Sequence, residues 1–351
     1  MSKFKVYKNN YLTPSKSKNM KMFFYLTLMI STMIVINSNS WINAWMGMEI
    51  NLMSFIPIMM NNMKNKNYSS MMIYFIIQAG ASSFLIMSMI MLKLQMNLFK
   101  FNLMINMIQL SLLLKLGASP FHWWMPKIIV NLSWMNCFIL LTWQKIAPLF
   151  LLTLTNFNML IYLSILFSTM IGAILGMNQN SIKLILTYSS INHLGWMMMN
   201  MYLNLNMLMT YFYFYFFINL MICLLLNNLK IYFLHQLFKM NNQDMYIKLI
   251  TISSFFSLSG LPPFIGFLPK FFTLMIMMNN NLILESILFI IMATISLSYY
   301  INPILSMLII TKFNLKWNKK IIQISKMIMS ILMMNLLLLM IYYLPLMNME
   351  L

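Results

Sequence analysis

The chain has 351 residues, of which 61% are hydrophobic and only 8% are charged, and its formal net charge is +19. Soluble domains carry roughly 25% charged and about 45–50% apolar residues, so no soluble core of this length could hide so much apolar surface. The composition therefore excludes a soluble fold and predicts that lipid surrounds most of the chain.

The apolar runs predict helices rather than a β-barrel. Residues 71–92, 161–177 and 330–344 are unbroken apolar stretches, whereas the strands of a membrane barrel alternate between apolar and polar residues. We therefore expect an all-α integral membrane protein with about eleven transmembrane helices, two of them broken.

The first 21 residues differ from the rest because they are polar and carry six lysines and no acidic residue. They lack the apolar stretch of a secretory signal. Two interpretations stay open for residues 1–21: a disordered basic tail, or sequence that lies upstream of the true start. Residues 22–351 are expected to form a single transmembrane domain.

Eleven apolar spans follow, each close to or longer than the ~20 residues that a bilayer requires. The fourth span contains the helix breakers Gly117 and Pro120, and the ninth contains Pro262 and Pro263. Inside a membrane, broken backbone survives only where it is buried in protein or lines a wet cavity, and discontinuous helices recur in ion-translocating proteins. The spans are expected at residues 22–38, 41–60, 68–93, 101–126, 131–154, 159–177, 181–200, 206–229, 246–277, 282–311 and 321–345.

The lysines predict the orientation of these spans. All 23 basic residues are lysines, and with eleven spans and the N-terminus on the lysine-rich side, that side collects 18 of them. The opposite side receives only Lys93 and Lys100. Such an excess marks the inner side of a membrane. Three lysines remain inside spans, where they orient nothing: Lys115, Lys145 and Lys270.

These intramembrane charges are the candidate functional residues. A charge at the centre of a spanning helix costs roughly 2.5–3.5 kcal/mol. Glu49 is the one acidic residue well inside a predicted span. Burial disfavours the charged form of a lysine and a nearby carboxylate favours it, so a Glu–Lys pair that opens and closes can control a proton. The alternative interpretation is that the lysines extend to the membrane surface and that Glu49 forms a structural hydrogen bond.

Histidines and cysteines complete the set of reactive side chains. His122 follows the first helix break and His193 lies in an apolar span, and both are candidates for a proton relay because imidazole titrates near neutral pH. Cys137 and Cys223 are isolated in apolar runs, which favours buried thiols over a disulfide or an iron–sulfur site. The sequence has no glycine-rich nucleotide motif, so we expect this chain to bind no cofactor and no metal.

Composition also indicates the origin of the gene. The chain has 45 methionines and no arginine, and its abundant residues are those with codons made only of A and T when ATA encodes methionine. That reading of ATA belongs to animal mitochondrial codes and predicts a mitochondrial gene.

Gly172 and Gly176 form a GxxxG pattern, which predicts close helix packing.

Several motifs then carry a family resemblance, between about residue 22 and about residue 310. They are SNSWINAWMGMEINLMSFIP, LLLKLGASPFHWWMP, LTWQKIAP, SSINHLGWM and SLSGLPPFIGFLPK. They closely resemble the motifs of the chain 2 family of antiporter-like membrane subunits in mitochondrial NADH–ubiquinone oxidoreductase, respiratory complex I. Residues 1–21 have no counterpart in that family, and the last span resembles it only in being hydrophobic.

The resemblance implies a role for each intramembrane charge within an antiporter-like fold with a central hydrophilic axis. Glu49 and Lys115 match the family's Glu–Lys pair, with Lys115 on the first broken helix. Lys145 matches the central lysine of the axis, and Lys270 matches the terminal lysine on the second broken helix. Some related subunits of the antiporter-like type carry a glutamate at that last position, where this chain has Lys270.

The function implied by the resemblance is proton translocation coupled to electron transfer from NADH to ubiquinone. NADH, FMN, iron–sulfur clusters and ubiquinone would bind to other subunits. Expected partners are the other membrane-arm subunits, including neighbouring antiporter-like subunits, and phospholipids such as cardiolipin; no nucleic acid is expected. The implied location is the mitochondrial inner membrane, with the N-terminus on the matrix side. A free-standing cation/proton antiporter and a non-catalytic assembly scaffold are the alternative functions.

Overall fold

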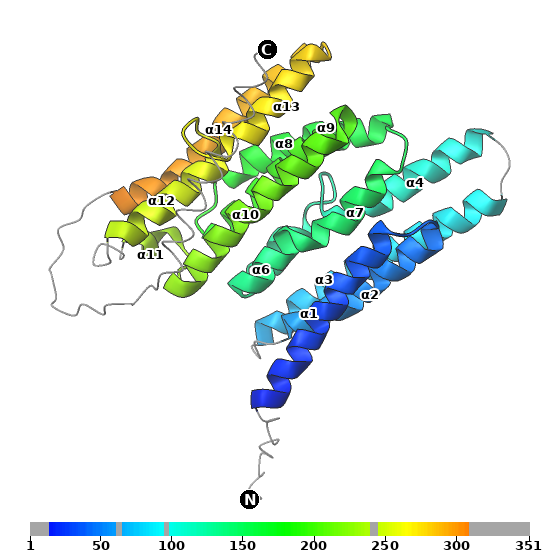
Figure 1. Cartoon of the computed structure of the whole chain (residues 1–351), viewed down its shortest axis with the longest axis horizontal. Helices are drawn as coiled ribbons and strands as arrows, with labels where there is room; N and C mark the ends of the chain where they lie inside the picture. Colours follow the sequence, from blue (N-terminus) through cyan, green and yellow to red (C-terminus); the bar gives the residue numbers. More distant parts are fainter. Residues whose placement is uncertain (1–13, 61–64, 95–97, 239–244, 309–351) are drawn as a thin grey trace, which may run out of the picture.

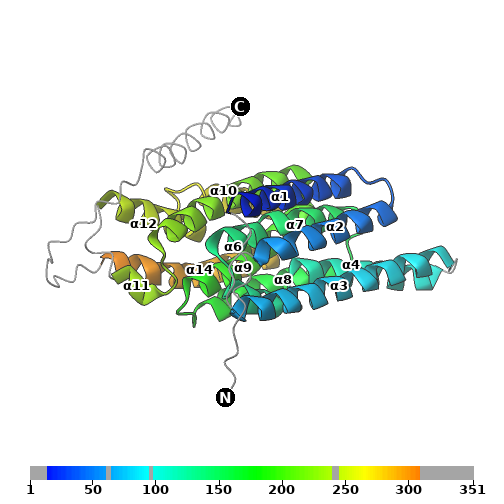
Figure 2. The ribbon, with the colours of Figure 1, turned by 90° about the horizontal axis from the view of Figure 1, so that it is seen from below.

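The computed structural model describes residues 14–60, 65–94, 98–238 and 245–308. Within these ranges every regular element is a helix, and the long helices lie side by side in roughly the same direction (Figures 1 and 2). Helices from the middle of the chain lie between the N-terminal and the C-terminal helices (Figure 1). The eleventh predicted span, 321–345, and residues 1–13 of the predicted basic tail lie outside the described residues.

The helices follow the predicted spans in order. They are α1 (Pro14–Ile36), α2 (Trp41–Met59), α3 (Asn65–Leu94), α4 (Leu98–Leu116), α5 (Trp124–Ile129), α6 (Trp134–Leu141), α7 (Trp143–Thr153), α8 (Met159–Gly176), α9 (Ile182–Leu203), α10 (Leu205–Leu229), α11 (Leu234–Phe238), α12 (Met245–Ser259), α13 (Phe267–Asn279) and α14 (Ile283–Leu308).

The all-α membrane fold predicted from the sequence is confirmed. Each of the first ten predicted spans coincides with one helix or with a pair of consecutive helices. Five segments are long and apolar enough to cross a bilayer, and shorter apolar helices accompany them within the described residues. The helix α1 begins at Pro14, before the expected start of the first span at residue 22.

The outer faces of the bundle are apolar and the interior holds polar groups. Leu284 is 82% exposed and Ile30 is 58% exposed, which suits contact with lipid chains. By contrast, α9 is buried along nearly its whole length from Ile182 to Asn200. With 22 residues and a rise of about 1.5 Å per residue, α9 is long enough to span the hydrocarbon layer.

The first predicted break interrupts the fourth span between α4 and α5. Gly117 ends α4 with a φ of 67°, a left-handed conformation that favours glycine. The carbonyls that the break frees have side-chain donors. Gln78 donates to the carbonyl of Lys115 at 3.3 Å, and the indole of Trp124 donates to that of Leu114 at 3.1 Å. Pro120 lies in the connecting turn.

The second predicted break separates α12 from α13. Gly260 follows the end of α12 with a φ of 78°, and Pro262 and Pro263 lie in the turn that leads to Phe267. A third interruption, between α6 and α7, was not predicted. There Thr142 bends the fifth span, and its hydroxyl donates to the carbonyl of Phe138 at 2.7 Å.

Candidate functional site: a row of buried lysines

The three lysines that the sequence leaves inside spans are all buried, each on a different helix of the bundle. Lys115 on α4 is 7% exposed, Lys145 on α7 is 1% exposed, and Lys270 on α13 is 6% exposed. None of their ammonium nitrogens has a described carboxylate oxygen within 4.0 Å. Buried charges are usually paired, so the neutral acceptors around each lysine define the character of the site.

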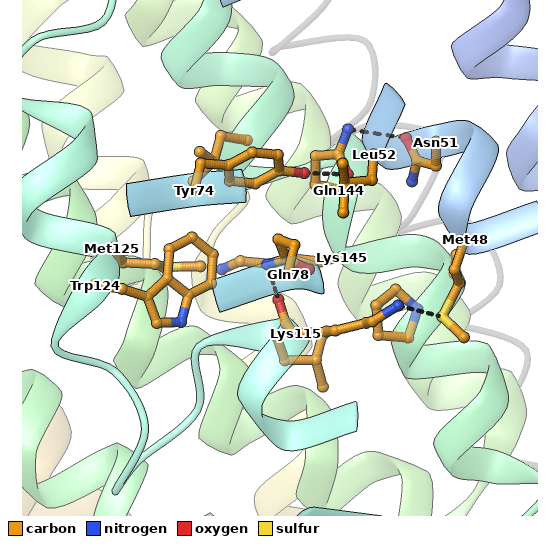
Figure 3. Close-up of a pocket in the computed structure, with 14 residues that line it drawn as sticks. Met48, Asn51, Leu52, Tyr74, Gln78, Lys115, Trp124, Met125, Gln144 and Lys145 are labelled. Carbon is orange, nitrogen blue, oxygen red and sulfur yellow. Dashed lines mark hydrogen bonds between the residues drawn. The ribbon is translucent and has the colours of Figure 1, made fainter. Parts of the chain in front are cut away.

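Lys115 lies next to the predicted carboxylate partner without forming an ion pair with it. Its Nζ atom contacts the Met48 sulfur at 3.6 Å (Figure 3), and a thioether is a weak acceptor. Glu49, the next residue on α2, lies within electrostatic reach of Lys115 and of Tyr74. The Glu49 Oε1 atom is buried and has no hydrogen-bond partner among the described residues. The two groups are therefore near each other, but they form no ion pair.

A small cavity of about 20 Å³ lies between Lys115 and Lys145 (Figure 3). Its polar lining includes Gln144 of α7, which donates to the Asn51 side chain at 3.0 Å and accepts from the Tyr74 hydroxyl at 3.4 Å. A polar space of this size holds a water molecule. The cavity therefore provides a polar connection between two lysines that lie on different helices.

Lys145 is bound by backbone and by an aromatic ring. Its Nζ atom donates to the carbonyl of Ser190 on α9 at 3.1 Å. The same atom lies 5.3 Å from the ring centroid of Tyr215 on α10, within the range of a cation–π contact. Lys145 thus links α7 to the central helix α9.

His193 lies on α9 three residues after Ser190, whose carbonyl binds Lys145, and three residues before Trp196, whose ring faces Lys270. It is within electrostatic reach of both Lys145 and Lys270. Its Nδ1 atom is 2.8 Å from the Tyr211 hydroxyl. His122, the other candidate, is half-buried, and its Nδ1 atom lies 3.2 Å from the carbonyl of Pro120 within the same turn. The structure therefore brings His193 to the lysines and gives His122 only a local contact.

Lys270 lies against the second helix break. Its Nζ atom donates to the carbonyl of Ser259, the last residue of α12, at 2.9 Å. Carbonyls at a helix C-terminus carry partial negative charge and attract cations. The Trp196 ring centroid lies 6.0 Å from the same nitrogen. The break thus supplies the acceptor that holds the lysine.

Lys183, one of the 18 lysines counted on the lysine-rich side, is also buried. It is 6% exposed at the start of α9, and its Nζ atom donates to the carbonyls of Val130, at 3.2 Å, and Leu132. The rings of Trp134 and Tyr232 have their centroids 5.6 and 4.9 Å from that nitrogen. Both carbonyls belong to the turn that follows the short helix α5. Lys183 therefore fixes this turn, which lies after the first helix break, to the start of α9.

The polar side chains that surround the lysines were not predicted from the sequence. Three amides lie within apolar spans of the sequence: Asn51, Gln78 and Gln144. This placement could have indicated them, because a side-chain amide inside a membrane is costly unless it is hydrogen-bonded. No group of three or more His, Cys, Asp or Glu residues that could hold a metal occurs in the described part of the chain.

The broken helices and the buried lysines together define a membrane domain of the antiporter type. Residues 38–298 match the family described as "NADH:quinone oxidoreductase/Mrp antiporter, TM". A curated relative from Anopheles gambiae, named NADH-ubiquinone oxidoreductase chain 2, is 40% identical over 283 residues, covering 80% of this chain and 83% of the relative. A relative of the same name from Locusta migratoria is 34% identical over 304 residues, covering 86% and 89%. This chain belongs to the NADH–ubiquinone oxidoreductase chain 2 family.

The fold also resembles that of a solved complex. A chain in the structure of respiratory complex I from Thermus thermophilus with bound aureothin has a TM-score of 0.75 and 19% sequence identity. The similarity covers 82% of this chain and 70% of that chain. The two chains therefore share a fold over most of their lengths.

Proposed function

We propose that this chain translocates protons as a membrane subunit of respiratory complex I, using Glu49, Lys115, Lys145 and Lys270 as its relay. Electron transfer from NADH to ubiquinone takes place in other subunits, which hold the FMN and the iron–sulfur clusters. The observation that carries the proposal is that three buried lysines share one polar interior and none is paired with a described carboxylate.

The acceptors around these lysines suit reversible proton transfer. A carbonyl accepts a hydrogen bond from an ammonium group and, more weakly, from a neutral amine, so Lys145 and Lys270 can lose a proton and keep their contacts. A tight carboxylate partner would instead hold the charge in place. Without one, a modest change in the local field decides which lysine is protonated.

The relay starts at the open pair. When Glu49 closes on Lys115, the positive charge there is balanced, and its effect on Lys145 across the small cavity weakens. Lys145 can then bind a proton and pass it through His193 to Lys270. Moving one charge through the membrane field is worth about 2.3 kcal/mol per 100 mV, so several coupled steps are needed.

The setting of this relay is the mitochondrial inner membrane, with the N-terminus on the matrix side. The lysine asymmetry between the two predicted sides supports that orientation. The partners are other membrane subunits, including neighbouring antiporter-like subunits, and phospholipids such as cardiolipin that fill the gaps between them.

The test uses the assembled enzyme in sealed inner-membrane vesicles. Lys270→Met keeps a long apolar stem and removes the ammonium, so NADH oxidation that is limited by proton transfer is expected to fall on the order of tenfold or more. The matched control is Lys127→Met, because Lys127 is exposed beside Trp123 and is not placed in the relay. Unchanged proton transfer in Lys270→Met with normal assembly would rule out the relay as proposed.

A free-standing cation/proton antiporter is the second candidate, favoured by the Mrp antiporters in the matched family. Gentle solubilisation separates the two functions. If the chain migrates with a large assembly that oxidises NADH, the complex I function is supported. If it migrates alone and exchanges Na⁺ or K⁺ for protons in vesicles, the antiporter function replaces it.

A further inference from the structure

Helix α2, which carries Glu49, packs mainly against α1 and α3. Two side chains on one of its turns connect it to the helices that carry the first two lysines. Met48 contacts the Lys115 ammonium at 3.6 Å, and Asn51 accepts a hydrogen bond from the Gln144 side chain at 3.0 Å. Met48 is 4% exposed and Asn51 is 5% exposed. One buried turn of α2 is therefore tied both to α4 and to α7.

The same turn places Glu49 to one side of Lys115. Successive residues of an α-helix point about 100° apart, so Glu49 lies off the face on which Met48 contacts the ammonium. Its Oε1 atom is buried and has no hydrogen-bond partner among the described residues. To form an ion pair, the Glu49 carboxylate takes the place of the Met48 sulfur beside Lys115. Rotation of this turn of α2 brings about that exchange.

The backbone around Lys115 is held by other helices. Gln78 on α3 donates to the Lys115 carbonyl at 3.3 Å, and the Trp124 indole donates to the carbonyl of Leu114 at 3.1 Å. The movement that closes the ion pair therefore belongs to α2 rather than to α4. The cavity of about 20 Å³ at the junction of α2, α4 and α7 gives the side chains room to exchange (Figure 3).

The hydrogen bond between Asn51 and Gln144 opposes this rotation. Asn51 lies three residues after Met48 and close to the same face of α2, so rotation that moves Met48 off the lysine also moves the Asn51 amide off Gln144. Gln144 is held on its other side, because its side-chain oxygen accepts from the Tyr74 hydroxyl of α3 at 3.4 Å. Its nitrogen donates and its oxygen accepts, which fixes the orientation of the whole amide.

We propose that Asn51 and Gln144, here called the amide bridge, are positioning residues that hold α2 in the orientation in which Glu49 and Lys115 form no ion pair. The inference rests on the proposed function, because the amide bridge acts through these two members of the relay. Gln144 directly precedes Lys145 on α7. The bond that restrains the helix of Glu49 is therefore attached next to the central lysine.

The deciding experiment is Asn51→Leu in the assembled enzyme, made both in the wild type and in a Glu49→Gln background. Leucine has a similar size and removes the amide. Loss of one hydrogen bond shifts an equilibrium about fivefold, so the ion pair of Glu49 should persist and NADH oxidation by coupled vesicles should fall about fivefold.

The Glu49→Gln background separates positioning from simple support of the fold. No carboxylate is left there to pair with Lys115, so Asn51→Leu should cause no further loss of turnover. An amide that only stabilises the fold would lower turnover by the same factor in both backgrounds. Wild-type turnover in Asn51→Leu, or an equal loss in the two backgrounds, would overturn the amide bridge.

Asn136→Leu is the matched control. Asn136 on α6 is 6% exposed and donates to the Ile58 carbonyl of α2 at 3.1 Å, so it is also a buried amide that binds α2. Ile58 lies nine residues after Glu49, about 13 Å farther along the helix. Any change of turnover in Asn136→Leu should therefore be the same in both backgrounds.

Exchange of the two amides keeps the test decisive in two further cases. If Glu49→Gln leaves no turnover to compare, or if Asn51→Leu does not assemble, the double variant Asn51→Gln with Gln144→Asn is compared with Gln144→Leu. The exchange moves one methylene group across the bridge and keeps its hydrogen bond, so its turnover should be close to that of the wild type, whereas Gln144→Leu should be slow. Equal turnover in these two variants would overturn the amide bridge.

Glu49→Gln alone separates this result from a failure of the proposed function. If Glu49→Gln slows proton transfer while Asn51→Leu matches the wild type, the relay stands and only the amide bridge is wrong. If Glu49→Gln and Lys145→Met both keep wild-type proton transfer, the relay itself fails, and the amide bridge has nothing to position.

Discussion

Gly260 and Lys270 are in contact across the second helix break. A β-carbon on Gly260 would lie 3.0 Å from Cδ and 3.1 Å from Nζ of Lys270. The glycine also has a φ of 78°, which side chains with a β-carbon rarely adopt. One residue therefore ends α12 and leaves room for Lys270, the last lysine of the proposed relay.

Gly260→Ala is expected to disturb the lysine and the break together. The left-handed conformation costs an alanine about 1–2 kcal/mol, and the added methyl group displaces Lys270 from the Ser259 carbonyl. Coupled NADH oxidation should fall and the thermal stability of the enzyme should decrease. Gly80→Ala is the control, because a β-carbon there has open space within 4 Å and should leave both quantities nearly unchanged.

Glu49→Gln is expected to lower coupled turnover without impairing assembly. The substitution removes the negative charge near Lys115 and retains the shape of the side chain. The buried Oε1 atom has no hydrogen-bond partner to lose, so the free energy of unfolding should change little. Glu285→Gln is the matched control. In the wild type the Tyr162 hydroxyl donates to Glu285 Oε1 at 2.6 Å. Glutamine keeps an oxygen that can accept this hydrogen bond, so the variant should retain wild-type turnover. If Glu49→Gln retains the same wild-type turnover as Glu285→Gln, Glu49 is not part of the relay.

His193→Phe and His122→Phe should differ in their effect on the rate of proton transfer. His193 lies between two relay lysines, so its loss is expected to slow proton transfer on the order of tenfold. His122 contacts only the Pro120 carbonyl in its own turn, so its loss should leave proton transfer unchanged. Both variants are compared by the rate of proton release from vesicles after a pulse of NADH. A larger defect in His122→Phe would contradict this assignment.

Lys183→Met tests a structural role rather than a proton-carrying one. The variant leaves the carbonyls of Val130 and Leu132 without their ammonium donor, which costs about 1–3 kcal/mol for each buried group left unpaired. Less assembled enzyme is expected on native gels, and the enzyme that does assemble should pump normally. Normal assembly with lost pumping would instead place Lys183 in the proton path.

The helices and their breaks were predictable from the sequence because their causes are local. Gly117 and Gly260 end helices through their own backbone conformation, and the prolines that follow cannot continue a regular helix. The buried lysines were also predictable, because three charges without a place on either side of the membrane must lie inside the bundle.

Contacts between distant residues were not predictable in the same way. Gln144 bonds to Asn51, 93 residues away in sequence, and no short-range pattern encodes that pairing. Lys183 was counted only as an orienting charge of the lysine-rich side, and the sequence did not indicate that the carbonyls of Val130 and Leu132 would bind it. The open state of Glu49 and Lys115 likewise depends on how α2 and α4 pack.

Lys145 is the residue on which the proposed relay depends most, because it would carry protons between the cavity and His193. The most direct measurement is the number of protons released per NADH oxidised by sealed vesicles that carry Lys145→Met, with Lys127→Met beside it. The relay predicts a lower ratio in Lys145→Met and the wild-type ratio in Lys127→Met. An enzyme with Lys145→Met that assembles fully and keeps the wild-type ratio would contradict it.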